Sequence, residues 1–389
     1  YDILVTNFEG FRIVNEMLGV NGGNIILKQV GKALNAIDNK IGIIYGRMEG
    51  DKFAILIKSA KLPDGLKLIK ESIDKIINRT PLILKIGIAN IWDDNIESAY
   101  ERAIKTLHYI AHDYSKAIAL YDEKVNESYI RSQNLILDFD DAIKDHQFLV
   151  YLQPQINSYD NTIIGAEALI RWHHPKYGMI PPSEFIPLFE KNMMINRLDM
   201  FVWEEACRFL KKWSDDEYKK LSISVNISTK DFYLIDVVST IIGLKDKYQI
   251  ETNRLKLEIT ESAFVNDQDL LIKNVVALQK AGFIVEMDDF GSGYSSFNSL
   301  KDIPIDVLKL DMKFLDGDIN NKKTSEILTS VISMAHRINL PVIAEGVETK
   351  EEFSCVKKLG ADYIQGYYYG KPEPAYEFER LNFKGRINI

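Results

Sequence analysis

The chain has 389 residues, of which 46% are hydrophobic and 27% are charged, and its formal net charge is −8. This length accommodates two domains, or one barrel with an appendage, and the composition is ordinary for a globular protein with real cores. The negative charge and the lack of a sustained basic run argue against a nucleic-acid polymer as partner. An anionic substrate would need metal ions or a few local cations to receive it.

Compartment and membrane attachment are constrained by composition as well. No apolar run approaches the roughly 20 residues of a transmembrane helix, so we expect no membrane segment in this chain. The cysteines, Cys207 and Cys355, lie far apart and indicate neither a disulfide framework nor a thiolate metal site, which favours a reducing cytoplasm. The start at Tyr1 without a signal-like leader is consistent with a fragment, such as the cytoplasmic portion of a larger protein, membrane-anchored or not.

The first part of the chain is typical of a small α/β domain, with a hairpin signalled by the turn Met48-Glu49-Gly50-Asp51. A polar, helix-compatible segment then links this part to the rest. We expect a domain at 1–122, a helical linker at 123–137 and a second domain at 138–389. Within the first domain we expect a strand at 3–5 and helices at 11–18 and 23–37. The hairpin follows with strands at 41–45 and 53–57, and then a strand at 82–89 and a helix at 97–112.

From Leu149 onward, short apolar strands alternate with longer amphipathic helices, which indicates parallel strands with helical crossovers. Eight strands fit a closed, TIM-like (β/α)8 barrel. The first two are separated by only seven residues, 156–162, so they form a hairpin and one strand should run antiparallel. The predicted strands are 149–155, 163–171, 222–226, 254–259, 283–288, 306–310, 342–345 and 363–365.

Oxygen-bearing side chains and one lysine occur at or near the C-terminal ends of these strands, which converge on one face of a βα barrel. Buried carboxylates are costly without a cation, so a metal centre is the simplest explanation. Oxygen donors without histidine suit Mg²⁺, Mn²⁺ or Ca²⁺. The residues are Glu167, Asn226, Glu258, Asp288, Asp289, Lys309, Glu345 and Gln365.

The adjacent carboxylates of Asp288 and Asp289 suit two ions a few ångströms apart. Two such ions can hold a nucleophilic water and stabilise the leaving oxygen of a phosphodiester. The residues by themselves therefore indicate metal-assisted chemistry on an anionic substrate.

An ordered set of motifs surrounds these residues: Gln153-Pro154, Glu167-Ala168-Leu169, Asn226-Ile227-Ser228, Glu258-Ile259-Thr260-Glu261, Asp288-Asp289-Phe290-Gly291-Ser292-Gly293-Tyr294, Lys309-Leu310-Asp311, Ala344-Glu345-Gly346-Val347-Glu348 and Gln365-Gly366-Tyr367. In this order, over 138–374, the set resembles the EAL family of cyclic di-GMP phosphodiesterases. The resemblance implies a phosphoric diester hydrolase that opens cyclic di-GMP to linear pGpG, and it implies a homodimer.

The resemblance also implies roles at matched positions. One Mg²⁺ or Mn²⁺ ion would be held by Glu167, Asn226, Glu258 and Asp288. A second would be held by Asp288, Asp289 and Glu345. Lys309 would orient or deprotonate the attacking water, and Gln365 would help to position it. Gln153 and Arg171 would hold the substrate's phosphate and backbone, and Glu261 would brace the loop 290–296.

Two motifs stand out in the first domain, Glu49-Gly50-Asp51-Lys52-Phe53 and Asn7-Phe8-Glu9-Gly10-Phe11-Arg12. With them the domain resembles a degenerate GGDEF domain, a nucleotidyl-cyclase-like α/β fold. Neutral Asn7 stands where a metal-binding aspartate is expected, and Lys52 puts a cation where an acid belongs. We therefore expect no diguanylate cyclase activity. Asn15 matches a position that contacts guanine, and we hypothesise that this domain binds GTP weakly and tunes the barrel.

Other interpretations remain open. The barrel would be a non-catalytic cyclic di-GMP receptor if it bound the nucleotide without turnover. It would be a protein-interaction module if it ignored the nucleotide. Retention of Lys309 and the acids argues against the first, and retention of Arg171 and Gln153 against the second. Lys309 could instead merely neutralise Asp311 or Glu345. The aromatic run 367–369 is typical of packing at a barrel rim, although one ring could stack on guanine.

Overall fold

The computed structural model describes residues 1–92, 95–111, 113, 115–215, 218–265, 268–291, 303–312 and 322–383. The chain forms two compact units, Tyr1–Leu137 and Asp138–Ile389. None of the helices in the described ranges has the length and apolar character that crossing a membrane requires.

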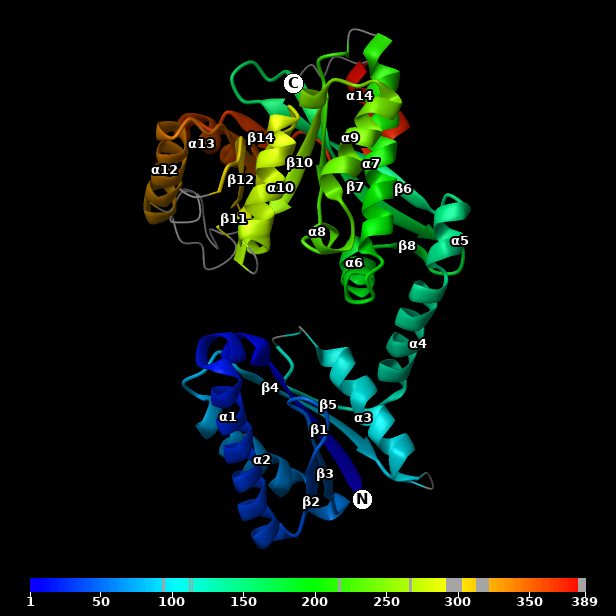
Figure 1. The fold of residues 1–389 in the computed structure, drawn as a ribbon, viewed down its shortest axis with the longest axis vertical. Coiled ribbons are helices and arrows are strands. Elements are labelled where there is room, and N and C mark those ends of the chain that lie inside the picture. The colour runs from blue at the N-terminus through cyan, green and yellow to red at the C-terminus, as the bar shows by residue number, and fades with distance from the viewer. Residues whose placement is uncertain are drawn as a thin grey trace. The chain divides into compact units, whose positions relative to one another are not determined.

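The first unit is a five-stranded sheet with helices on both faces (Figure 1). The strand order is β2-β3-β1-β4-β5, with β1 antiparallel to both of its neighbours. One apolar core joins the sheet to α1 and α2, and a second joins the opposite face to α3. The elements are β1 (Asp2–Glu9), α1 (Phe11–Ile41), β2 (Ile44–Arg47), β3 (Phe53–Ile57), α2 (Leu62–Ile77), β4 (Ile83–Asn90), α3 (Ile96–Ile110), β5 (Ile118–Leu120) and α4 (Glu123–Leu137).

The small α/β unit and its hairpin are confirmed, but three local predictions were wrong or incomplete. The two expected helices are one helix, α1, kinked at Gly19, whose φ of 70° is open to glycine. Ile41 is not in a strand, because α1 continues to it and ends at Gly42 in the left-handed conformation. Helix α2 and strand β5 were missed, although Ile69, Ile73 and Ile77 carry a helical spacing.

The second unit is a closed barrel of eight strands, as predicted. Its strands follow each other around the barrel as β6, β7, β9, β10, β11, β12, β13 and β14, and β14 pairs with β6 again. Strand β6 is the antiparallel one, against both β7 and β14. The strands are β6 (Phe148–Asn157), β7 (Ile163–His174), β9 (Ser222–Asn226), β10 (Leu255–Thr260), β11 (Ile284–Phe290), β12 (Val307–Asp311), β13 (Val342–Glu345) and β14 (Tyr363–Gln365).

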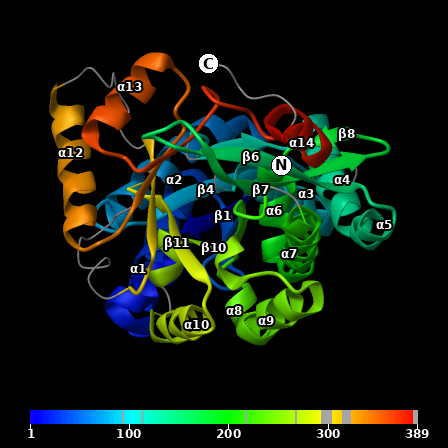
Figure 2. The ribbon, with the colours of Figure 1, turned by 90° about the horizontal axis from the view of Figure 1, so that it is seen from above.

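Helices cover the outside of this barrel (Figures 1 and 2). Two short strands extend its sheet, β8 (Gly178–Ile180) beside β7 and β15 (Glu373–Pro374) beside β6. The helices are α5 (Phe139–Lys144), α6 (Pro182–Lys191), α7 (Ile195–Lys212), α8 (Asp231–Leu234), α9 (Val237–Tyr248), α10 (Gln268–Lys280), α12 (Lys322–Arg337), α13 (Lys350–Leu359) and α14 (Ala375–Phe383).

The interior of the barrel is polar, and strand β10 shows why. Its residues Leu255 to Ile259 are all buried, and they alternate leucine and isoleucine with Lys256 and Glu258. Side chains alternate between the two faces of a strand, so the apolar residues pack beneath the helices while the charged ones face into the barrel. This alternation delivers charged groups to a place where apolar side chains usually stack.

Candidate active site

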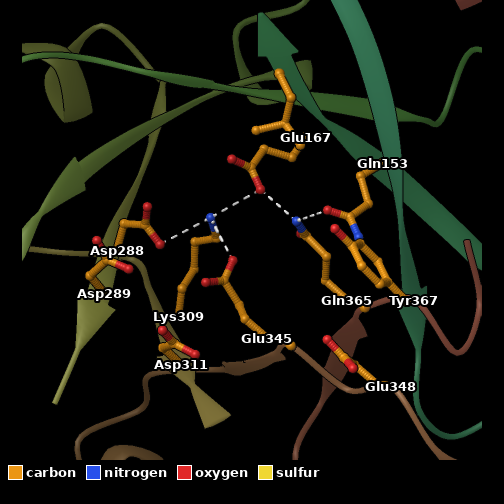
Figure 3. A pocket seen from close by; sticks show the side chains of 13 residues that line it. Gln153, Glu167, Asp288, Asp289, Lys309, Asp311, Glu345, Glu348, Gln365 and Tyr367 are labelled. Carbon is orange, nitrogen blue, oxygen red and sulfur yellow. Dashed lines mark hydrogen bonds and ion pairs between the residues drawn. The ribbon is translucent and has the colours of Figure 1, made fainter. Parts of the chain in front are cut away.

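One ammonium group, that of Lys309, lies among four carboxylates at the C-terminal end of the barrel. Figure 3 shows those of Glu167, Asp288 and Glu345. Its Nζ is 2.7 Å from Glu258 Oε2 and 2.7 Å from Glu345 Oε1. Asp288 Oδ1 follows at 3.2 Å and Glu167 Oε2 at 3.6 Å. Lys309 is 1% exposed. The lysine thus contacts acids from four other strands, which is more than the neutralisation of a single neighbour.

Glu167 reaches this layer although β7 continues well past it to His174. The parallel pairing of β7 with β9 ends at Glu167, so this residue is the last of the barrel portion of the strand. Its last residues, Trp172 to His174, form a hairpin with β8. Because β6 runs antiparallel, Gln153 pairs directly with Glu167 and joins the same layer.

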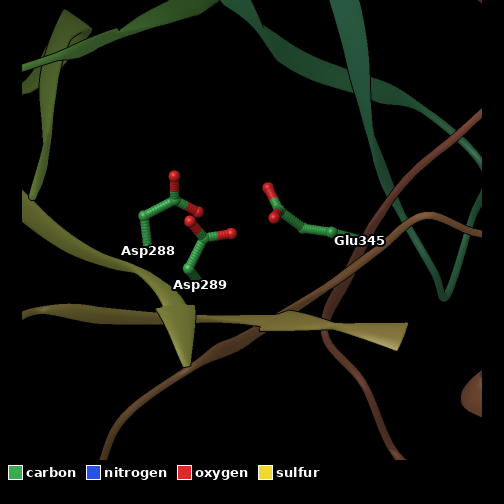
Figure 4. A group of neighbouring side chains, drawn as sticks. All are labelled: Asp288, Asp289 and Glu345. Atoms are coloured by element: carbon green, nitrogen blue, oxygen red, sulfur yellow. The ribbon is translucent and has the colours of Figure 1, made fainter. Parts of the chain in front are cut away.

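A β-bulge brings Asp288 and Asp289 to the same side of β11. Neighbouring residues in a regular strand point to opposite faces. Here the register of β11 with β12 shifts between Met287 and Phe290, and Asp289 has a φ of 56°. Asp288, Asp289 and Glu345 each offer a carboxylate oxygen within 4.8 Å of the others (Figure 4). A left-handed aspartate costs about 1–3 kcal/mol, a strain typical of functional sites.

The carboxylates of this layer outnumber the cations that face them, and the pKa values of three of these carboxylates are raised. Burial raises the pKa of Glu258 well above its ordinary range, and the charge of Glu167 raises it further. Burial likewise raises the pKa of Glu345 well above its range, and that of Asp289 to a lesser degree. Burial alone lowers the pKa of Lys309, but the surrounding carboxylates outweigh it and hold that pKa well above its usual value.

These residues fit divalent cations. Within the described part of the chain, the buried Glu258 Oε1 accepts no hydrogen bond, and Glu258 Oε2 and Asp288 Oδ1 have only their ion pairs with Lys309. Five carboxylates surround one lysine, and all the donors are oxygen. Hard ions such as Mg²⁺ and Mn²⁺ take such donors.

Amide side chains orient the first of these carboxylates. Asn226 Nδ2 donates to Glu167 Oε1 at 3.1 Å. Gln365 Nε2 donates to Glu167 Oε2 and, at 3.2 Å, to Gln153 Oε1 (Figure 3). Glu167 is therefore held by amide groups from two strands, β9 and β14, which leaves its rotamer little freedom.

Two predicted residues lie outside this layer. Arg171 is four residues further along β7, where its Nη1 donates to Ile170 O and its guanidinium lies 5.5 Å from the centre of the Tyr151 ring. Burial lowers the pKa of Arg171. Glu261 Oε2 accepts a hydrogen bond from Gly291 N at 3.3 Å, at the start of the predicted loop. The rest of that loop, 292–296, lies outside the described residues.

A cavity of about 300 Å³ opens above the carboxylates, and three of its lining residues with a charged or aromatic side chain were missed as site residues. They are Asp311, Glu348 and Tyr367. Asp311 and Glu348 belong to the motifs Lys309-Leu310-Asp311 and Glu345-Gly346-Val347-Glu348, so a signal was present. Tyr367 is 52% exposed and has Lys371 Nζ 5.2 Å from its ring centre.

The two following tyrosines pack elsewhere. Tyr368 stacks on Phe353 with ring centres 5.4 Å apart, and Tyr369 contacts both of these rings. Of the aromatic run, Tyr367 alone lines the cavity.

The motif residues of the first unit form a different arrangement. Asp51 Oδ2 accepts a hydrogen bond from Phe8 N at 2.9 Å. Lys85, 1% exposed, donates to the carbonyls of Asp113 and Lys116 at 2.6 and 2.7 Å, and its Nζ lies 3.9 Å from Glu9 Oε2. The ammonium of Lys85 thus faces Glu9, the acidic residue of the motif at 7–12.

Comparisons with known proteins agree with this architecture and site. The EAL domain profile matches residues 137–372, and the profile described as diguanylate cyclase, GGDEF domain, matches residues 1–103. The chain belongs to the EAL family and carries a GGDEF-type domain in front of the barrel.

Two relatives align with nearly the whole chain. The bifunctional diguanylate cyclase/cyclic di-GMP phosphodiesterase MucR of Pseudomonas aeruginosa is 29% identical over 96% of this chain and 56% of MucR. The signaling protein YkoW of Bacillus subtilis is 31% identical over 95% of this chain and 48% of YkoW. The chain thus spans about half the length of these relatives. The solved PaMucR phosphodiesterase, a c-di-GMP complex, is 33% identical with a TM-score of 0.60, covering 63% of this chain and 99% of that one.

Proposed function

We propose that the barrel is a metal-dependent phosphodiesterase that hydrolyses one phosphodiester bond of cyclic di-GMP to give linear pGpG. The observation that carries this proposal is the layer of five carboxylates around Lys309, from four strands, at the floor of an open cavity. Membership of the EAL family and the likeness to the PaMucR phosphodiesterase support the choice of substrate.

The proposed metal ligands are Glu167, Asn226, Glu258 and Asp288 for one Mg²⁺ or Mn²⁺, and Asp288, Asp289 and Glu345 for a second. When bound, such ions lower the pKa of a water molecule and stabilise the charge on the leaving oxygen. The contacts of Glu167 with Asn226 and Gln365 orient its carboxylate before any ligand arrives.

The remaining residues act on the water and the substrate. Lys309, whose ammonium already touches both groups of acids, would donate a hydrogen bond that orients the attacking water, and Gln365 would help to place that water. Gln153, which lines the cavity, and Arg171 would hold the nucleotide's phosphate and backbone. Tyr367 offers its exposed ring for stacking on guanine, since a base and an aromatic ring stack face to face.

We further propose that the first unit makes no cyclic di-GMP and instead regulates the barrel, with GTP as its candidate ligand. The acid-to-amide change at Asn7, the cation at Lys52 and the buried ammonium of Lys85 near Glu9 all disfavour binding of the metal ion that cyclase chemistry needs. Incubation with GTP and Mg²⁺ tests for product, and calorimetry with GTP tests for binding. Cyclic di-GMP formation would refute the first part, and absence of heat the second.

The barrel activity is tested by incubating the whole chain with cyclic di-GMP and Mg²⁺ or Mn²⁺ and separating the products by chromatography. We expect pGpG from the wild type and from Glu326→Ala, an exposed acid on α12, but none from Glu167→Ala. Binding without turnover would favour the receptor alternative, and absence of both would favour an interaction module. Light scattering tests the proposed homodimer, and limited proteolysis tests the proposed boundaries 1–122, 123–137 and 138–389.

A further inference from the structure

A second polar layer lies inside the barrel beneath the metal-binding acids. Ser224, Lys256 and Glu286 each stand two residues before Asn226, Glu258 and Asp288, so they face the same interior. Ser224 and Glu286 are 0% exposed and Lys256 is 7% exposed. A charged pair in such a place is costly unless every group is satisfied, and an apolar pair would fill the space more cheaply. Its presence therefore calls for a reason.

The contacts of this layer form a continuous chain. Lys256 Nζ lies 2.9 Å from Glu286 Oε1. Ser224 Oγ donates to Glu286 Oε2 at 2.8 Å and accepts from Gln155 Nε2 at 3.4 Å. Gln155 Nε2 also donates to the side chain of Gln365, Oε1, at 3.1 Å. Gln365 in turn donates to the metal-binding carboxylate of Glu167.

The donor and acceptor of every hydrogen bond in this series follow from its charged end, the carboxylate of Glu286. Glu286, facing an ammonium, can only accept, so the Ser224 hydroxyl points its hydrogen at Glu286 and offers a lone pair to Gln155. Gln155 must then present N–H groups, and Gln365 must meet them with its carbonyl oxygen. The Gln365 amide is left with its N–H groups toward Glu167, and a flip would set oxygen against the carboxylate.

From these contacts we propose that Ser224, Lys256 and Glu286 are positioning residues that, through Gln155 and Gln365, set the orientation of Glu167 for metal binding. This inference rests on the proposed function for its catalytic meaning, but its effect on metal affinity does not. Outer partners of metal ligands typically change metal affinity or activity by about 10–100-fold when removed. Since this series of hydrogen bonds acts on Glu167 through two amides, we expect a change in metal affinity of about 10-fold.

The first experiment compares Ser224→Ala with Ser222→Ala in the whole chain. Ser222 is a matched control, because it is a buried serine on the same strand and face but donates to the carbonyl of Ile164 instead. Mn²⁺ binding is measured by calorimetry, and the thermal midpoint is recorded in EDTA. We expect Ser224→Ala to weaken Mn²⁺ binding by about 10-fold and Ser222→Ala to change it less than about twofold. Equal affinities for the two variants would overturn the proposal.

A second variant, Glu286→Gln, covers the case in which Ser224→Ala does not fold. The amide keeps the shape of the side chain but can donate as well as accept, so the direction of the chain is no longer set. We expect weaker Mn²⁺ binding and, with cyclic di-GMP, a lower kcat at an unchanged KM. A folded Glu286→Gln protein with wild-type Mn²⁺ affinity would refute the proposal. A wild type that binds Mn²⁺ but yields no pGpG would refute the proposed function and leave the positioning role standing.

Discussion

Replacement of Lys309 by methionine isolates the central charge of the site. The ammonium lies within 3.6 Å of four carboxylates and is 1% exposed. Methionine has a similar length but no charge, so the acids lose their internal cation. Removing one partner of a buried ion pair costs about 3–5 kcal/mol, and 1 kcal/mol shifts the midpoint of a domain of this size by about 2–4 °C. In EDTA we therefore expect a midpoint lowered by roughly 6–20 °C.

Metal ions should reverse this loss of stability but not the loss of activity. Mn²⁺ would supply the missing positive charge, so the midpoint of Lys309→Met should rise more on Mn²⁺ addition than that of the wild type. Turnover should still fall by at least about 100-fold, the usual contribution of a group that moves or orients a proton. Scanning calorimetry with EDTA or Mn²⁺ and the pGpG assay measure both effects.

The exposed Lys211 on α7 provides the control, since Lys211→Met should change stability by less than about 0.5 kcal/mol. A Lys309→Met protein with the wild-type midpoint in EDTA would show that the carboxylates are not held by this ammonium. Full turnover in the variant would show that Lys309 merely neutralises charge.

Three further predictions concern the acids and the cavity. Because asparagine tolerates positive φ, Asp289→Asn should change the free energy of unfolding in EDTA by less than about 0.5 kcal/mol. It should nevertheless weaken Mn²⁺ binding, as calorimetry would detect; unchanged affinity would exclude Asp289 as a ligand. The raised folded-state pKa of Glu258 and Glu345 favours the folded state at low pH, so metal-free stability should fall as pH rises above their ordinary value of 4.5; urea unfolding in EDTA that gave rising stability would contradict this. Tyr367→Ala should raise the KM for cyclic di-GMP by about 5–100-fold, the worth of one stacked base, with an unchanged midpoint, whereas Tyr368→Ala should lower the midpoint; equal KM values for the two would argue against stacking.

Local patterns in the chain were sufficient to predict the barrel. Each strand is a short apolar run between longer amphipathic segments, and this alternation depends only on neighbouring residues. Seven of the eight predicted strands differ from the observed ones by no more than two residues at either end, and only β7 extends further, to His174. The loss of Ile41 to α1 shows the usual limit, because an isoleucine next to a helix end suits either element.

The residue types at the strand ends were also readable from the sequence, and they indicated metal chemistry. The sequence could not say which carboxylates Lys309 touches, since its partners come from strands β7, β10, β11 and β13. It could not foresee the bulge at Asp289, because a shift of register depends on how β11 meets β12. Nor did it indicate Lys85 beside Glu9, two residues on different strands of the first unit.

The sequence by itself determined the fold class, the family motifs and the supply of oxygen ligands, because strand and helix periodicities and motif order are properties of short segments. Tertiary structure alone decided how these groups meet. Ser224 and Glu286 are 62 residues apart, and Gln155 and Gln365 are 210 apart, yet each pair is hydrogen-bonded. Closure of the barrel makes those contacts, because it brings residues at the same height on different strands next to one another. The layer of acids around Lys309, and the polar layer beneath it, exist only in the closed barrel.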